Sequence, residues 1–293
     1  MIVLLFLFST LFAFSSPLTI DGPLAGATRL IVTKFNDDLA SVSQRAQVAP
    51  SALAKANPDI DFDALEIDQL ILVPSHTILP SKTRKGIVIN IAERRLFDFT
   101  TPGKVSIYSV GVGRENWPTL TGNFTITSKR HLPVWNVPRS VHLEEKSKGN
   151  ILPKSIPPGP DNPLGAHSMR LSNSSYLIHG TNDPSGIGIP STSGCVSLFP
   201  DDIEQLFQHI PVGTKVEIVN KPIKMAHYKN RLWIESHLDE KTHNNPFPIQ
   251  KIDDMINLVK NKYHLTDLQV RELMNILNDN TGMIYPLNSG GTS

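Results

Sequence analysis

Apolar and polar residues alternate along several short runs in the middle of the chain, and glycine or proline separates these runs. Alternation with period two is typical of strands that bury one face. It predicts strands at residues 87–91, 96–99, 105–110, 123–127 and 216–219. Ile203, Leu206 and Phe207 follow helical spacing instead and predict a short helix at 201–207. We therefore expect a mainly β domain here, built as a sandwich or barrel.

A different pattern precedes this region. Residues 28–76 give a strand at 29–32, two helices at 39–48 and 50–57, and a closing strand at 70–74. This order predicts a small, separate α+β module. The polar residues 77–85 are expected to form a linker between this module and the β domain.

Helical spacing returns in the extension at residues 223–287, after a further strand predicted at 231–235. The sequence Thr266-Asp267-Leu268-Gln269 is a capping box that opens the second of two predicted helices. We expect these helices to form a hairpin packed on the β domain, with a protein-docking arm as the alternative. Residues 288–293 are predicted to be a disordered tail.

The first 15 residues resemble a signal peptide. Their apolar run at 2–14 has the usual length of a signal-peptide core, and it is shorter than the roughly 20 residues that span a bilayer. We expect cleavage after Ser15 and export, with an uncleaved anchor as the alternative. No later segment is apolar enough to predict a membrane helix, so no transmembrane segment is expected after cleavage.

Composition narrows the class of protein. An apolar content of 40% and a charged content of 19% suit a globular chain with a real core. The net charge of +1 predicts no nucleic-acid partner. The ten histidines show no metal-ligand spacing, so we expect no metal and no cofactor.

Cys195 is the only cysteine of the 293 residues, so it cannot form an internal disulfide. His179 ends an apolar strand upstream of it, and the glycine- and proline-rich residues 182–190 are expected to turn the chain back toward it. A thiol beside an imidazole is a candidate nucleophile and base. The backbone N–H groups around Ser193 and Gly194 are candidate oxyanion donors. Two ordinary core residues are the alternative interpretation of Cys195 and His179.

Several short sequence motifs are more specific than the spacing of Cys195 and His179. They are Gly86-Ile87-Val88-Ile89-Asn90, Gly111-Val112-Gly113, Pro157-Pro158-Gly159-Pro160-Asp161-Asn162-Pro163-Leu164-Gly165, Ile178-His179-Gly180-Thr181-Asn182, Gly186-Ile187-Gly188, Gly194-Cys195-Val196 and Pro211-Val212-Gly213-Thr214. In this order they resemble the YkuD-type L,D-transpeptidases, in particular the ErfK/YbiS group of bacterial envelope enzymes. The resemblance implies a catalytic domain at residues 86–222 with the β-sandwich or barrel fold of that family.

The module at residues 28–76 is similar to the LysM peptidoglycan-binding module. Ala56-Asn57-Pro58 and the segment 68–74 carry this resemblance, while Asn36-Asp37-Asp38 replaces the usual Gly-Asp pair. The resemblance implies contact with glycan, and a spacer of the same ancestry that binds no glycan is the alternative.

The resemblance to the L,D-transpeptidases also implies roles for single residues. Cys195 would be the acylated nucleophile, His179 its general base, and the Gly180 carbonyl the group that orients His179. The implied substrate is a peptidoglycan tetrapeptide stem in the periplasm. Its terminal D-alanine leaves, and an amine of another stem or of an envelope lipoprotein or outer-membrane protein takes the acyl group.

Two positions depart from the family pattern. Ser193 stands where the family usually has histidine, and Ser197 stands where it usually has an arginine or asparagine that contacts substrate. Arg170 is our candidate for a cation that compensates for the missing arginine. The alternative is that Arg170 is an ordinary strand residue that faces solvent. Tyr176 is expected to line the site and Trp135 the donor groove. The alternative for both side chains is ordinary packing. These departures keep two rivals open: an L,D-carboxypeptidase or hydrolase of protein–peptidoglycan links, and a catalytically weakened wall-binding protein.

Overall fold

The computed structural model describes residues 17–172, 175–238 and 249–287. The predicted signal peptide at 1–15 and the predicted tail at 288–293 therefore lie outside the described residues. Among the helices that are described, none combines the length and the apolar character needed to cross a membrane.

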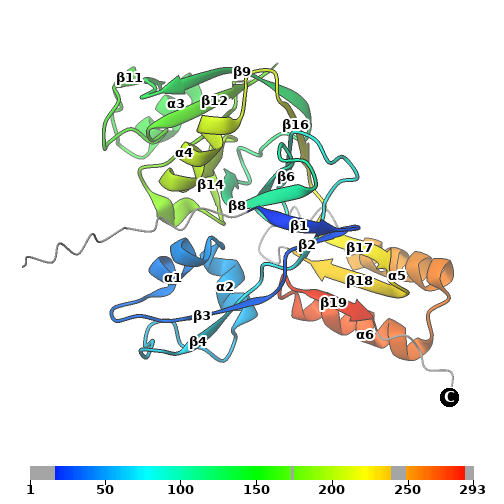
Figure 1. The fold of residues 1–293 in the computed structure, drawn as a ribbon. Coiled ribbons are helices and arrows are strands. Elements are labelled where there is room, and N and C mark those ends of the chain that lie inside the picture. The colour runs from blue at the N-terminus through cyan, green and yellow to red at the C-terminus, as the bar shows by residue number, and fades with distance from the viewer. Residues whose placement is uncertain (1–16, 173–174, 239–248, 288–293) are drawn as a thin grey trace, which may run out of the picture.

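The middle of the chain forms a closed ring of strands, which lies in the upper half of Figure 1, above the N-terminal and C-terminal elements. The ring runs β15-β13-β12-β9-β16-β6-β7-β8, and β8 pairs again with β15. The strands are β6 (Ile87–Asn90), β7 (Arg95–Asp98), β8 (Lys104–Gly113), β9 (Gly122–His131), β12 (His167–Leu171), β13 (Leu177–His179), β15 (Val196–Leu198) and β16 (Lys215–Val219). Closure through the β8–β15 pairing leaves no open edge in the ring. The expected mainly β fold is confirmed, and it is a barrel.

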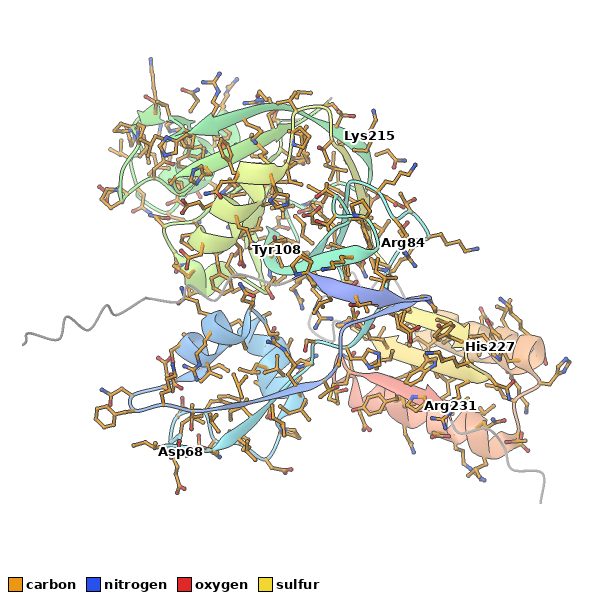
Figure 2. The ribbon with its side chains drawn as sticks, in the orientation of Figure 1. Asp68, Arg84, Tyr108, Lys215, His227 and Arg231 are labelled. Carbon is orange, nitrogen blue, oxygen red and sulfur yellow. The ribbon has the colours of Figure 1, made fainter. Side chains whose placement is uncertain are left out.

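The barrel interior is filled by apolar side chains that alternate inward along each strand. Tyr108 on β8 is among the largest of the fully buried side chains (Figure 2). Helix α4 (Pro200–His209) places Ile203 and Leu206 in the same cluster, as their helical spacing predicts. Smaller elements connect the ring: β10 (Trp135–Asn136), α3 (Arg139–Ser147), β11 (Ser155–Ile156), the 3₁₀ turn η1 (Pro184–Gly186) and β14 (Pro190–Thr192).

The N-terminal module has the predicted order of elements, namely β3 (Arg29–Val32), α1 (Leu39–Ala46), α2 (Pro50–Ala56) and β4 (Leu70–Val73). Its two strands pair antiparallel, and Val42, Leu53 and Ile71 form a core of its own. Asp38 and Ser41 make a capping box at the start of α1.

The predicted polar linker at 77–85 is wrong in its first part. Thr77 and Ile78 form strand β5 (Thr77–Ile78) and are buried. This strand pairs with β2 (Leu24–Ala25), which pairs with β1 (Leu18–Asp21), and β1 extends the main sheet along β8. The segment is buried because Thr77 and Ile78 donate hydrogen bonds to the carboxylate of Glu235, which lies far along the chain.

The C-terminal extension is a second small α/β unit. Strands β17 (Ile223–Tyr228), β18 (Arg231–Ser236) and β19 (Ile284–Leu287) form an antiparallel sheet. The two predicted helices are present as α5 (Ile249–Tyr263) and α6 (Asp267–Asp279), with the predicted capping box at Thr266. Their expected packing on the β domain is wrong, because they share a separate core with this sheet (Figure 1).

Buried ion pairs join this unit to the barrel. The Lys224 Nζ lies 2.6 Å from Glu93 Oε2 and 3.1 Å from Glu235 Oε2, and Arg95 lies 3.4 Å from Glu235. Glu93, Glu235 and His237 are close enough to one another to resemble a metal site. The Lys224 ammonium already provides the cation that these carboxylates need, so we interpret the cluster as structural.

Candidate active site

Strand register places the candidate nucleophile and base on one face of the sheet. Strands β13 and β15 run parallel, with Ile178 beside Val196 and His179 beside Ser197. Ile178 and Val196 point into the barrel core. Because side chains alternate along a strand, His179 and Ser197 lie on the opposite face. Cys195, two residues before Ser197, belongs to that face as well.

The neighbouring strand adds Arg170 to this face. Strand β12 pairs antiparallel with β13, so Arg170 lies opposite Leu177. Its side chain is exposed, and its charge acts to lower the pKa of the Cys195 thiol. Arg170 is thus both close enough to Cys195 to influence it and open to solvent.

The imidazole of His179 is buried and oriented by the main chain. Its Nδ1 lies 2.5 Å from the carbonyl oxygen of Gly180. A carbonyl only accepts, so Nδ1 carries the proton and Nε2 presents a lone pair. Burial lowers the pKa of His179 to about 4, against the opposing effect of the Gly180 hydrogen bond. The ring is therefore neutral at pH 7 and can accept a proton at Nε2.

The thiol of Cys195 is largely enclosed. The Leu177 N–H donates to Sγ at an N to S distance of 3.4 Å. Burial raises the pKa of Cys195 above its ordinary value, while the Leu177 hydrogen bond and the Arg170 charge act in the opposite direction. The resting pair is accordingly a neutral thiol and a neutral imidazole.

Two threonines that the sequence did not single out fix the loop before Cys195. The Thr119 hydroxyl donates to the Gly194 carbonyl at 3.0 Å, and the Thr192 hydroxyl donates to the Cys195 carbonyl at 2.6 Å. The Gly194 N–H donates to the Thr192 hydroxyl at 3.2 Å. This predicted oxyanion donor is thus already engaged. Nothing in the sequence pattern marks Thr119 and Thr192, because their role depends on how the loops fold.

Gly194 has a conformation that favours glycine, with φ of +100°. A Cβ atom there would lie 2.3 Å from a ring carbon of Tyr176. Tyr176 therefore packs against the backbone just before Cys195. Trp135 lies on strand β10 of a two-stranded ribbon with β11.

The two serines that depart from the family pattern have different surroundings. The Ser193 hydroxyl accepts a hydrogen bond from Arg114 Nη2 at 3.2 Å. Ser197 is buried against Gly111, where an added Cβ would lie 2.4 Å from the Ser197 hydroxyl oxygen. Arg114 was missed by the sequence reasoning. The one signal that could have found it is its position directly after Gly111-Val112-Gly113.

Comparison with known proteins identifies the family of the chain. Residues 84–218 match the family model of the YkuD L,D-transpeptidase catalytic domain. The chain is 39% identical over 240 residues to the probable L,D-transpeptidase YcfS of Escherichia coli (strain K12), covering 76% of this chain and 74% of that relative. It is 34% identical over 236 residues to the probable L,D-transpeptidase ErfK/SrfK of Salmonella typhimurium, covering 77% and 74%.

A third relative is the probable L,D-transpeptidase YbiS of Escherichia coli (strain K12), which is 33% identical over 226 residues and covers 74% of this chain and 72% of the relative. These matches cover about three quarters of the chain. The chain therefore belongs to the L,D-transpeptidase family that carries a YkuD catalytic domain.

Proposed function

We propose that this protein is a peptidoglycan L,D-transpeptidase in which Cys195 carries the acyl group. The observation that carries the proposal is the shared face of β13 and β15, where a buried His179 with its proton fixed on Nδ1 accompanies the Cys195 thiol. This arrangement supplies a nucleophile and a base with a free lone pair. The names of the sequence relatives support the same reaction class.

The proposed reaction has two halves. His179 Nε2 takes the thiol proton as Sγ attacks the carbonyl between the third-position diamino acid and the terminal D-alanine. The imidazolium then returns the proton to the leaving amine, D-alanine departs, and a thioester remains on Cys195. In the second half His179 takes a proton from the attacking amine, that amine takes the acyl group from sulfur, and the imidazolium returns the proton to the departing Sγ of Cys195. The acceptor is an amine of a second stem or of an envelope protein.

Two groups support the charged intermediates of this scheme. The Gly180 carbonyl would stabilise the imidazolium through Nδ1, which is the place of the acidic member in a catalytic triad. Backbone N–H groups at Ser193 and Gly194 would hold the oxyanion. For Gly194 this requires exchanging its 3.2 Å hydrogen bond to the Thr192 hydroxyl for one to the substrate.

The flanking module fits the same substrate. Residues 28–76 resemble LysM and would hold the enzyme on the glycan strands of peptidoglycan. This substrate lies in the bacterial envelope, so we place the protein in the periplasm after removal of the first 15 residues.

The proposal is tested by incubating the purified protein with disaccharide-tetrapeptide muropeptides and analysing products by mass spectrometry. We expect free D-alanine and cross-linked dimers from the wild type, and neither from Cys195→Ala. Tripeptide products without dimers would show that the protein is a carboxypeptidase and not a transpeptidase. An unchanged substrate together with binding to sacculi would show that the protein only binds the wall.

A further inference from the structure

Arg114 lies at the rim of the candidate active site and is fixed there by its main chain. It directly follows β8, and its N–H donates to the Thr192 carbonyl at 2.9 Å. Its own carbonyl accepts from the Trp117 N–H at 2.9 Å. The side chain then reaches Ser193, two residues before the nucleophile. The guanidinium is therefore anchored to the loop that presents Cys195.

The guanidinium of Arg114 is already paired with a carboxylate. Glu144 on helix α3 binds Arg114 through both oxygens, at 2.9 and 3.0 Å. Arg114, followed by Lys148, lowers the pKa of Glu144 to about 2, so that the group stays ionised at neutral pH. Paired hydrogen bonds of this kind are the geometry that a guanidinium uses to recognise a carboxylate.

The two partners are held very differently. Arg114 is tied by its backbone to the Cys195 loop, whereas helix α3 has no buried residue along its whole length. The bridge between Arg114 and Glu144 is partly exposed, and such ion pairs contribute little to stability. Glu144 can accordingly leave Arg114 at small cost, while Arg114 stays beside the nucleophile.

We propose that Arg114 binds the α-carboxylate of the terminal D-alanine of the donor stem, and that Glu144 holds this position until the substrate carboxylate replaces it. This assignment rests on the proposed function. Ser193 and Ser197 carry no charge and supply no cation next to Cys195. Under this assignment Arg114 supplies that cation. Arg114 makes Ser193 part of the binding site through their hydrogen bond.

A tether is the competing role, in which Arg114 only holds helix α3 against the barrel. Variants of the two partners of the ion pair distinguish these two roles. Removing either partner breaks a tether, so Arg114→Met and Glu144→Gln would change the KM for the donor in the same direction. Under our proposal the two variants act in opposite directions, because one removes the binding group and the other removes its competitor.

The experiment measures kcat and KM for release of the terminal residue from two donors. One donor ends in a free carboxylate and releases D-alanine, and the other ends in a carboxamide and releases D-alaninamide. For the free acid we expect Arg114→Met to raise KM by about ten- to hundred-fold, as for loss of a charge-assisted hydrogen bond, and Glu144→Gln to lower KM. Arg114→Met should also abolish the preference for acid over amide. Lys146→Met, exposed on the same helix, is the matched control and should leave both donors unaffected.

Changes of KM in the same direction for Arg114→Met and Glu144→Gln would overturn the assignment, as would an acid preference that survives Arg114→Met. Both outcomes would leave the proposed function standing, because the wild type still turns over. A wild type that releases nothing from either donor would overturn the proposed function and this assignment together. Thermal unfolding of each variant identifies any that fail to fold, and Arg114→Lys, which keeps the charge, then replaces Arg114→Met with a smaller expected rise in KM.

Discussion

Burial acts on His179 and Cys195 in the same sense, because it disfavours the charged form of each. The pKa of the histidine falls to about 4 and the pKa of the thiol rises. A thiolate–imidazolium pair is therefore not the resting state. In the proposed reaction the proton would move to His179 as the substrate carbonyl is attacked, so the histidine would act as a general base rather than as a fixed counter-ion.

The pH dependence of acylation follows from these shifts. A protonated His179 cannot accept the thiol proton, so the rate falls only as the pH drops through about 4. We expect the acidic limb of the profile for Cys195 acylation by a carbapenem to lie near that value. It should lie well below the ordinary histidine pKa of about 6.5. Stopped-flow rates between pH 3.5 and 8 measure it, and an acidic limb near 6.5 would contradict the neutral-pair account.

Gly194 provides a second test at the level of one residue. Gly194→Ala would place a Cβ against Tyr176 in a backbone conformation with φ of +100°. We expect acylation to slow by about 100-fold, the effect of an ångström-scale displacement of a reacting group. Gly213→Ala is the matched control, since Gly213 has φ of +95° with no atom within 4 Å of the added Cβ. Equal losses of acylation in both variants would mean that general destabilisation is the cause.

Single residues also show how far a local sequence pattern can point to a site. Cys195, His179 and Gly180 stand in contiguous motifs, so their neighbours in sequence are also their neighbours in space. Arg114 and Thr119 contact the Cys195 loop from another part of the chain, and Glu144 in turn contacts Arg114. No local pattern encodes such meetings, because they depend on the closure of the barrel and on the path of its loops.

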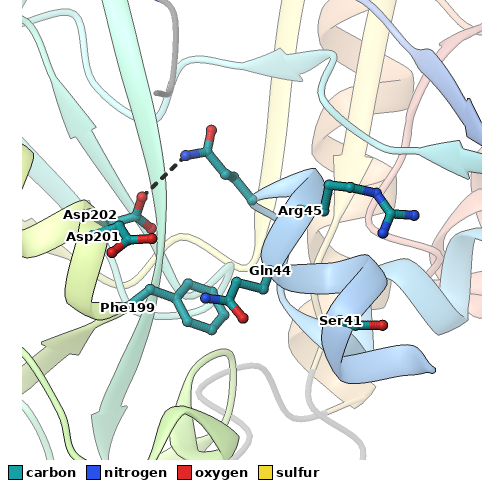
Figure 3. A pocket seen from close by; sticks show the side chains of 7 residues that line it. Ser41, Gln44, Arg45, Phe199, Asp201 and Asp202 are labelled. Atoms are coloured by element: carbon teal, nitrogen blue, oxygen red, sulfur yellow. Dashed lines mark hydrogen bonds between the residues drawn. The ribbon is translucent and has the colours of Figure 1, made fainter. Parts of the chain in front are cut away.

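At the scale of elements, helix α1 of the N-terminal module faces helix α4 of the barrel. A cavity of about 240 Å³ lies between them, lined by polar and charged side chains and one aromatic ring (Figure 3). The Gln47 amide donates across the gap to Asp202 Oδ1 at 3.3 Å. The other carboxylate oxygen of Asp202 is buried without a hydrogen-bond partner among the described residues.

Burial, with a smaller effect of Asp201, raises the pKa of Asp202 to about 7. The folded protein therefore binds a proton that the unfolded chain has lost above its ordinary pKa of about 3.9. Stability from this group is present at low pH and is lost as the pH rises toward 7. Asp202→Asn cannot ionise, so its thermal midpoint should exceed that of the wild type by more at pH 8 than at pH 5.

Asp201→Asn is the control for this prediction, because Asp201 is exposed on the same turn of α4. Because Asp201 contributes to the raised pKa of Asp202, the difference of Asp201→Asn from the wild type should grow between pH 5 and pH 8, but by less than that of Asp202→Asn. A difference for Asp202→Asn that does not change between these pH values would contradict a buried, protonated Asp202.

Elements differ in how well sequence predicts them, for physical reasons. Helices α1, α2 and α6 carry strong local signals of spacing and capping, and they lie where expected. Strands β1, β2 and β5 were missed because two of them have only two residues, and pairing with distant segments stabilises all three. Strand β19 was missed for a similar reason, since it becomes a strand by pairing with β18.

At the scale of the whole molecule, buried charges connect the barrel, the β5 segment and the C-terminal unit. Lys224 binds Glu93 of the barrel, Glu235 of the C-terminal sheet, and the Thr77 hydroxyl of β5. The lysine and both carboxylates are nearly inaccessible to solvent. These pairs resist replacement because loss of one partner leaves the others charged and unpaired.

Lys224→Met should therefore lower the free energy of unfolding by about 3–5 kcal/mol. Lys229→Met removes an exposed lysine that pairs with Asp21 at 2.7 Å and should leave the unfolding midpoint nearly unchanged. Denaturant unfolding of the two variants against the wild type makes the comparison. A Lys224→Met protein as stable as Lys229→Met would show that the buried cluster does not hold the units together.

The central claim is that Cys195 carries the acyl group of the donor stem, and intact-mass spectrometry tests it most directly. The protein is mixed with a tetrapeptide donor whose side-chain amine is acetylated, so that no amine acceptor is present. The reaction is quenched in acid and the intact mass is measured, beside Cys195→Ala. We predict that the wild type gains the mass of the donor less D-alanine, on the peptide that contains Cys195, and that Cys195→Ala gains nothing. D-Alanine release by Cys195→Ala, or the same adduct on that variant, would contradict the account.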